Sequence, residues 1–335
     1  MNNHQLKVTP IKDEQTAKCS FVLDKLSICF NDPNPENVKK TYGLLISDHV
    51  TSFTPGMSVT KNQRYMASCR LRLPFDSSVQ ETAFFEVGPR CPGLASYRLE
   101  FNPAKFAVAN GLDDLIVFLT SAIDPDPIEF FRGGKVTRCD VAIDLPDLHL
   151  EDVIVRASRL QKHGLYSDRH GYVQTTYIGT PTSRRIVAYE KSVKGASASS
   201  LRLECRVKPR CLGYETVELK NPFTGVTLIP AAFPDATGIG IPSQFLADSL
   251  RIGGAKRVLM ALDASQRKVF KKALKEAQSV LPDLDTLWLS WPHVLIGCGL
   301  GKHLGALQTF PATKSAVNCK SNSAGAVGSD LDTVA

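Results

Sequence analysis

The segment Thr175–Lys191 carries two tyrosines, on either side of a Thr-Pro-Thr-Ser turn. Tyr177 precedes the turn, Tyr189 follows it, and Lys191 comes two residues after Tyr189. A tyrosine hydroxyl, with an ordinary pKa of about 10, attacks a phosphate only when cations or a metal ion surround it. Residues two apart in a strand share a face, so Lys191 can stabilise charge beside Tyr189. The pattern favours Tyr189 as the nucleophile. Tyr177 is the alternative nucleophile. It is the less favoured one, because a tyrosine beside a glycine and a turn more often packs in the structure or stacks on a base.

Four stretches alternate apolar and polar residues with the period of two that a half-buried strand requires. If these strands are neighbours, one face of their sheet forms the core and the other gathers carboxylates, arginines and Tyr189. The four stretches are Tyr97–Asn102, Val136–Leu145, Arg184–Lys191 and Leu201–Val207.

Two or three convergent carboxylates are the oxygen ligands that Mg²⁺ prefers, and such an ion polarises a phosphate. The pattern therefore predicts a site for Mg²⁺ or Mn²⁺, flanked by arginines that can contact a phosphate group. A plainer interpretation remains open, in which a solvated antiparallel face carries cross-strand salt bridges. The expected metal ligands are Asp140, Glu204 and Glu100, and the expected DNA-binding arginines are Arg138, Arg184, Arg185, Arg202 and Arg206.

The positive charge of the chain is concentrated around the tyrosines. The whole chain has a net charge of +7, and the segment Glu151–Lys220 holds 13 Lys plus Arg against 7 Asp plus Glu, so 13 − 7 = +6 of the excess lies there. An anionic partner is expected for this segment, and nucleic acid is the main class. A solvated basic face without a ligand is the alternative.

Cysteine usage and hydropathy exclude several classes of protein. The nine cysteines are odd in number and never spaced as C-x-x-C, so neither a disulfide framework nor a zinc knuckle is indicated. No apolar run approaches the ~20 residues that cross a bilayer. We therefore expect a soluble protein of a reducing cytoplasm with no membrane partner.

Strand and helix signals alternate in the first half of the chain, and strands then follow one another. This predicts an α+β fold with a mainly antiparallel sheet, helices on one face, a smaller C-terminal helical unit and a disordered tail. Helices are expected over Asn34–Ser47, Gly111–Ile123 and Leu150–His163, and beyond Asn221 near 242–251 and 263–280. The expected divisions are a flexible N-terminus (1–20), a catalytic domain (21–220), the helical unit (221–310) and the tail (311–335).

Five short motifs resemble, in order, the tyrosine rolling-circle replication initiators of filamentous phages, of the gene II protein type. Plasmid initiators are more distant relatives of that family. The motifs are L-D-K-L-S-I-C-F, L-E-F-N-P-A-K, T-R-C-D-V-A-I-D, T-S-R-R-I-V-A-Y-E-K and L-R-L-E-C-R, and together they cover Phe21–Val207. The resemblance implies that the tyrosine of Y-x-K, here Tyr189, attacks a DNA phosphodiester. It also implies that Asp140, Glu204 and Glu100 lie in the metal site.

The function that the resemblance implies is a metal-dependent DNA strand-nicking and strand-joining endonuclease. It would nick double-stranded phage or plasmid DNA at the origin, form a 5′-phosphotyrosyl intermediate and rejoin the strand in rolling-circle replication, without a nucleotide cofactor. Its partners would be double-stranded origin DNA, single-stranded product DNA and the host helicase and polymerase, with a homodimer left open. Two alternatives are a conjugative relaxase with the same chemistry and a non-catalytic basic DNA-binding regulator.

Overall fold

The computed structural model describes most of the chain between residues 19 and 304. The described residues are 19–47, 58–60, 63–74, 80–123, 126–158, 160, 163–170, 173–180, 184–192, 199–231, 239–278 and 281–304. The predicted tail (311–335) and nearly all of the predicted flexible N-terminus (1–20) lie outside them.

Ten described strands form one sheet in the order β2-β3-β4-β5-β1-β6-β11-β10-β9-β8, and every neighbouring pair is antiparallel. The predicted α+β fold with a mainly antiparallel sheet is therefore confirmed. The strands are β1 (Ser20–Phe30), β2 (Ser58–Thr60), β3 (Tyr65–Leu73), β4 (Glu81–Pro89), β5 (Tyr97–Phe101), β6 (Lys135–Pro146), β8 (His163–Ser167), β9 (Val173–Gly179), β10 (Arg185–Ser192) and β11 (Ser199–Val207).

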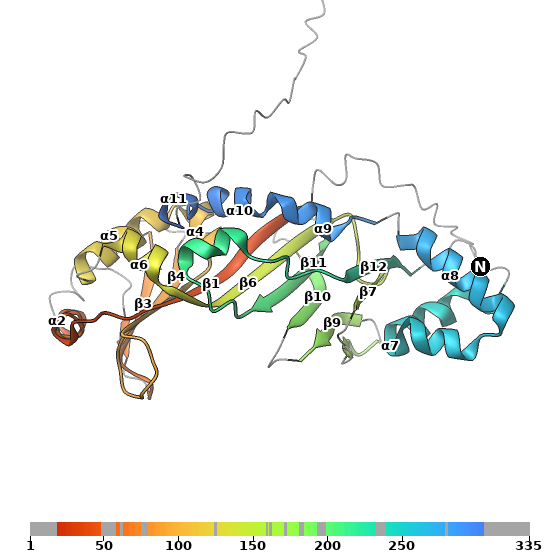
Figure 1. Cartoon of the computed structure of the whole chain (residues 1–335), viewed down its shortest axis with the longest axis horizontal. Coiled ribbons are helices and arrows are strands. Elements are labelled where there is room, and N and C mark those ends of the chain that lie inside the picture. Colours follow the sequence, from red (N-terminus) through yellow and green to blue (C-terminus); the bar gives the residue numbers. More distant parts are fainter. Residues whose placement is uncertain are drawn as a thin grey trace, which may run out of the picture.

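Helices cover one face of this sheet, as predicted, and Figure 1 shows α4, α5, α6, α10 and α11 side by side above it. The apolar parity of the strands packs against them: Leu99, Val141, Ile186 and Leu203 are fully buried in one hydrophobic cluster. The opposite face of the middle strands has no described helix over it. The helices are α2 (Pro35–Ile46), α4 (Pro103–Ala109), α5 (Leu112–Ala122), α6 (Pro127–Gly133), the 3₁₀ helix η1 (Gly213–Glu218), α9 (Leu284–Leu287), the 3₁₀ helix η3 (Trp288–Ser290), α10 (Trp291–Gly297) and α11 (Gly301–Leu304).

The predicted helix over Leu150–His163 is wrong. This segment forms β7 (Val153–Ala157), which pairs with β12 (Val226–Pro230) in a separate two-stranded sheet. The run Val-Ile-Val is buried on both sides: Val155 faces the main cluster and Ile154 faces a second one. A β-branched run covered on both faces favours a strand, although its apolar residues do not alternate with polar ones.

The second hydrophobic cluster lies between β7, β12 and the helices α7 (Ser243–Ala261) and α8 (Ala264–Gln278), at one end of the molecule in Figure 1. The helical unit predicted beyond residue 221 therefore exists but is smaller, because α9, α10 and α11 return to the main cluster. The sequence Asp-Ala-Ser-Gln caps the start of α8: Asp263 accepts from the Gln266 amide at 2.9 Å, and the Gln266 side chain accepts from the Asp263 amide at 3.0 Å. None of the helices in the described ranges combines the length and the hydrophobicity of a membrane crossing.

Candidate functional site

The uncovered face of the sheet is polar along β5, β1, β6, β11 and β10. Residues directly opposite each other in an antiparallel pair project to the same face, so the register decides which side chains meet. Arg202 lies opposite both Tyr189 and Asp144, and Arg206 lies opposite Asp140. Glu204 lies opposite Ala142, between the two aspartates of β6. The register therefore brings the predicted nucleophile and two of the predicted metal ligands onto one continuous surface.

Two β-bulges in the β1–β6 pair add side chains to this polar face. The register shift between Leu23 and Lys25 makes Asp24 an extra residue of β1, and a second shift makes Thr137 an extra residue of β6. Each bulge lets two consecutive residues point away from the core while the apolar residues before and after both stay buried. Asp24 and Lys25 thus both join the polar face, where simple alternation would leave only one of them.

Tyr189 is half-buried on this face, and its surroundings act on its hydroxyl in opposite directions. Burial raises the pKa of Tyr189, a hydrogen bond and the positive charge of Arg202 lower it, and the negative charges of Glu204 and Asp24 raise it. The net effect is a pKa above the ordinary value, so the phenol is protonated at neutral pH. Further positive charge beside the hydroxyl is needed to make it a nucleophile.

Arg202, and not Lys191, is the cation in contact with Tyr189. Arg202 is 7% exposed, and its guanidinium holds Asp144 with two hydrogen bonds, from Nε to Oδ1 at 2.6 Å and from Nη2 to Oδ2 at 2.8 Å. Lys191 shares the face of Tyr189, as predicted, but its Nζ lies 2.8 Å from Asp144 Oδ2. Burial raises the pKa of Asp144, and the hydrogen bonds from Arg202 and Lys191 outweigh it, so the pKa lies below the ordinary value. Lys191 therefore helps to hold the carboxylate that orients Arg202.

Asp140 is 2% exposed and lies between two arginines. The Arg138 Nε is 2.9 Å from Asp140 Oδ1 and 3.1 Å from Oδ2, and the Arg206 Nε is 3.3 Å from Oδ1. Arg138 also contacts Oδ2 through Nη2. Both carboxylate oxygens are thus occupied by arginine, and two of the predicted DNA-binding arginines are anchored by a predicted metal ligand.

Glu204 differs from the other carboxylates of the face, because no hydrogen bond or ion pair joins its side chain to another described residue. Burial raises the pKa of Glu204, and the negative charges of Asp140 and Asp24 raise it further, against smaller opposing effects of Arg206 and Arg202. Crowded like charges of this kind would be relieved by a bound cation or by protonation.

Glu100 belongs to a neighbouring ion-pair group on β5 and β1. Its Oε1 lies 3.3 Å from Lys25 Nζ, and its Oε2 contacts Arg98, which also binds Glu86 at 2.6 Å. The charge of Glu100 reaches Arg138 and raises the pKa of that guanidinium, so the two groups are adjacent. As a metal ligand Glu100 would have to leave these partners.

Tyr177, the alternative nucleophile, packs in a cation–aromatic stack. The Arg185 guanidinium carbon lies 4.0 Å from the centre of the Tyr177 ring, and the Tyr166 ring meets it edge-on at 5.2 Å. Both tyrosines nevertheless open into one hollow of about 440 Å³, which Glu204 also lines. Both tyrosines are therefore placed to contact a ligand that enters this hollow.

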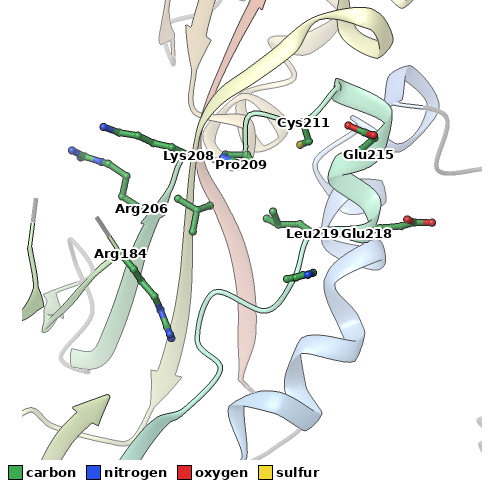
Figure 2. A pocket seen from close by; sticks show the side chains of 10 residues that line it. Arg184, Arg206, Lys208, Pro209, Cys211, Glu215, Glu218 and Leu219 are labelled. Carbon is green, nitrogen blue, oxygen red and sulfur yellow. The ribbon is translucent and has the colours of Figure 1, made fainter. Parts of the chain in front are cut away.

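Arg184 stands apart from the other predicted DNA-binding arginines. It precedes β10, and its Nη2 donates to the Thr224 carbonyl at 2.8 Å. It lines a second cavity, of about 660 Å³, between the end of β11 and η1. In Figure 2, Arg206 and Lys208 extend away from the opposite wall, which carries Cys211 and Glu215, while Arg184 runs in a different direction.

The carboxylates suit a divalent cation in donor type but do not form a complete site as they stand. The Glu204 oxygens have no hydrogen-bond or ion-pair partner among the described residues, and burial together with the negative charges of Asp140 and Asp24 raises the pKa of Glu204. Among the described residues, however, no group of three His, Cys, Asp or Glu side chains is arranged to hold a metal ion. A metal held by Glu204 and Asp140 would have to displace Arg138 from Asp140 or share its oxygens.

Sequence reasoning did not assign a role to Asp24 or Asp144, and both act on Arg202. Asp24 Oδ1 lies 3.5 Å from Arg202 Nη1, and Asp144 makes the two hydrogen bonds given above. A signal for Asp24 exists in the sequence L-D-K-L, where two polar residues between two leucines break the period of two.

The chain matches no protein-family model and no curated protein. Its function is therefore inferred from the site itself.

Proposed function

We propose that the chain is a DNA strand-nicking and strand-joining replication initiator with Tyr189 as its nucleophile. One observation carries the proposal: Tyr189 lies opposite the buried Arg202 and lines a hollow together with Glu204, whose side chain has no hydrogen-bond or ion-pair partner among the described residues. Titratable groups with shifted pKa values that line one hollow, here Tyr189 and Glu204, are typical of functional sites. The order of the five sequence motifs supports the same activity.

In the proposed reaction, the Tyr189 oxygen attacks a DNA phosphorus in line with the 3′ oxygen. The bond from tyrosine to phosphorus forms, the bond from phosphorus to the 3′ oxygen breaks, the phenol proton passes to water and the 3′ oxygen takes up a proton. The product is a 5′-phosphotyrosyl strand with a free 3′ hydroxyl that can prime synthesis. The reverse reaction rejoins the strand and needs no nucleotide, because the phosphodiester energy is conserved.

Within this reaction Arg202 donates to the Tyr189 oxygen and stabilises the developing phenolate. Asp144, Lys191 and Asp24 hold Arg202 in that position. Glu204 and Asp140 would hold Mg²⁺ or Mn²⁺, which would neutralise charge on the scissile phosphate. Tyr177 and Arg185 would contact the base next to that phosphate.

The test uses supercoiled DNA of the circular replicon that encodes the chain, incubated with the protein and Mg²⁺. We expect nicked circles and a protein–DNA adduct that survives denaturation, with DNA attached at Tyr189 in peptide mass spectrometry. Intact circles and no adduct, with either Mg²⁺ or Mn²⁺, would rule out the proposed activity.

A non-catalytic DNA-binding regulator is the second candidate, and a specific observation favours it. Asp140, Asp144 and Glu100 are each paired with two basic side chains, as in an ordinary salt-bridged sheet face. A regulator would bind the same DNA without any adduct. A conjugative relaxase would form the adduct as well, and only the position of its nick, at a transfer origin, separates it from a replication initiator.

A further inference from the structure

A basic groove lies on the same polar face, beyond Asp140 toward the start of β6. It has a volume of about 620 Å³ and is formed by β1, β5, β6, the turn Gly93–Ala95 and the segment that follows β11. None of the described residues that line it is acidic. Its cationic lining residues are Arg64, Arg98, Lys135, Arg138, Lys208 and Arg210.

Three of these cations are available to a ligand. Arg98 and Arg138 are held by the carboxylates described above. Lys135, Lys208 and Arg210, in contrast, are exposed, and none has an ion-pair partner among the described residues. Three exposed like charges around one groove repel each other unless an anion binds there.

Backbone hydrogen bonds fix these three residues beside one another. The Arg210 amide donates to the Val136 carbonyl at 3.0 Å, and the Val136 amide donates to the Cys211 carbonyl at 2.8 Å. Lys135 forms a bridge with Leu212 on the same ladder. The segment after β11 therefore runs alongside the start of β6, and the sheet fixes the backbone positions of these three residues.

The backbone of Arg210 is strained. Its φ is +55°, a left-handed conformation that costs a residue with a Cβ about 1 kcal/mol and that glycine adopts freely. A large charged side chain at such a position is expected where the side chain itself has a role.

The groove is connected to the hollow of Tyr189 through a line of cations. Arg138 lines the groove and binds Asp140, which also binds Arg206. Arg206 in turn lines the hollow with Tyr189. Lys208, two residues after Arg206, extends in the same direction as Arg206 in Figure 2.

From this arrangement we propose that the groove binds the phosphate backbone of a DNA strand and leads that strand to Tyr189. The choice of DNA and the path to Tyr189 rest on the proposed function, whereas the anion-binding role of the groove rests on its own geometry. Exposed aromatic side chains are absent from its described lining, so the groove offers no ring on which a base could stack, and its exposed cations suit contacts to phosphates.

The test compares two triple variants of the full chain that lose the same charge. Lys135→Gln/Lys208→Gln/Arg210→Gln changes the groove, and Lys268→Gln/Lys271→Gln/Lys275→Gln changes the exposed surface of α8. Binding of a fluorescent single-stranded DNA 20-mer and of its duplex is measured by anisotropy at several salt concentrations. We expect the groove variant to bind at least tenfold more weakly, with a log–log salt slope shallower by about two to three, since each phosphate contact contributes roughly 0.7 to 0.9. The α8 variant should match the wild type.

A second variant, Arg210→Gly, separates the effect of losing the side chain from any effect on folding. It should unfold at the same or a higher temperature than the wild type, because it relieves the strained φ, and yet lose about one unit of slope. An unchanged slope in both groove variants, or an equal loss in the α8 variant, would overturn the proposal. Tripolyphosphate binding in the groove without any effect of the variants on DNA binding would also overturn it. Tighter binding of an RNA 20-mer than of the DNA 20-mer would overturn it as well.

Adduct formation distinguishes this inference from the proposed function. The groove variant should need more DNA to reach half-maximal adduct but should approach the wild-type rate at saturating DNA. Groove-dependent binding with no adduct at any DNA concentration contradicts the proposed function and leaves the groove as a DNA site. Normal adduct formation by the groove variant at limiting DNA contradicts only the proposed role of the groove and leaves the proposed nicking activity intact.

Discussion

Tyr189 lies directly opposite Arg202 across the β10–β11 pair, and Arg202 lies directly opposite Asp144 across the β11–β6 pair. The phenol, the guanidinium and the carboxylate thus form one row perpendicular to the strands. The carboxylate holds the guanidinium, and the guanidinium lies close enough to the phenol to oppose the rise in its pKa caused by burial. This row is the geometric basis of the proposed nucleophile.

Tyr189→Phe should eliminate the covalent adduct while leaving DNA binding within about twofold of the wild type, because only the hydroxyl is removed. Tyr177→Phe should leave the adduct detectable, since its ring still stacks with Arg185. The measurement is adduct yield on a denaturing gel, with the attachment site mapped by mass spectrometry. DNA attached at Tyr177, or an adduct that survives Tyr189→Phe, would reverse the assignment.

Chelation of divalent cations by EDTA should abolish nicking and leave DNA binding largely intact, since binding depends on lysines and arginines. Glu204→Gln should have the same effect on nicking. Mn²⁺ binding, followed by electron paramagnetic resonance, should weaken at least tenfold in this variant. Normal nicking by Glu204→Gln in Mg²⁺ would place the metal site elsewhere. Asp140→Asn is a poorer probe, because it also deprives Arg138 and Arg206 of their partner.

Glu204→Gln should be at least as stable as the wild type at pH 8. The pKa of Glu204 is raised in the folded protein, so the folded state holds its proton more tightly than the unfolded chain does. The free energy of unfolding therefore falls as pH rises from about 4.5 through the raised pKa. The glutamine cannot ionise and avoids this loss. Urea denaturation at pH 4 and pH 8 measures it, and a variant that is less stable only at pH 8 would contradict the expectation.

Asp144→Asn should lower the free energy of unfolding by on the order of 3 kcal/mol, because it leaves the buried Arg202 without its main partner. The pKa of Asp144 is lowered in the folded protein, so its contribution is present above the unfolded pKa near 3.8 and is lost as pH falls further. The difference between variant and wild type should therefore persist at pH 5 and shrink toward pH 2. Glu36→Gln, which breaks the exposed pair with Lys39, is the control and should cost less than about 1 kcal/mol. Equal costs for the two variants would show that Asp144 does not stabilise Arg202.

Gly254→Ala should destabilise the protein by about 1 to 2 kcal/mol. Gly254 bends α7 with a φ of +76°, which an alanine adopts only with strain, and the added Cβ would lie 2.2 Å from Arg156 Nη2. Gly43→Ala in α2 is the matched control, because nothing lies within 4 Å of its Cβ, and it should gain about 0.5 to 1 kcal/mol. Thermal unfolding of both variants checks the pair. A neutral Gly254→Ala would mean that the bend is not required.

The alternation of apolar and polar residues along the chain was sufficient to predict the middle strands of the sheet and the side of each strand that faces solvent. Tyr97–Phe101, Lys135–Pro146, Arg185–Ser192 and Ser199–Val207 are strands whose apolar parity is buried, because period-two patterning reflects burial directly. The same pattern in Tyr65–Leu73 would have predicted β3 as well. Helix caps such as Asp263 with Gln266 were readable for the same local reason.

The tertiary structure alone decided what depends on pairing between distant segments. Whether Arg202 or Lys191 meets Tyr189 follows from the register of β10 on β11, which no local pattern states. The two bulges in the β1–β6 pair place two consecutive residues on the polar face, Asp24 with Lys25 and Thr137 with Arg138, because the apolar residues on both sides stay in the core. Val153–Ala157 is a strand because two separate cores cover it. The basic groove exists because the segment after β11 pairs with the start of β6, about 70 residues away in the chain, and burial patterns report a residue's exposure but not its partner.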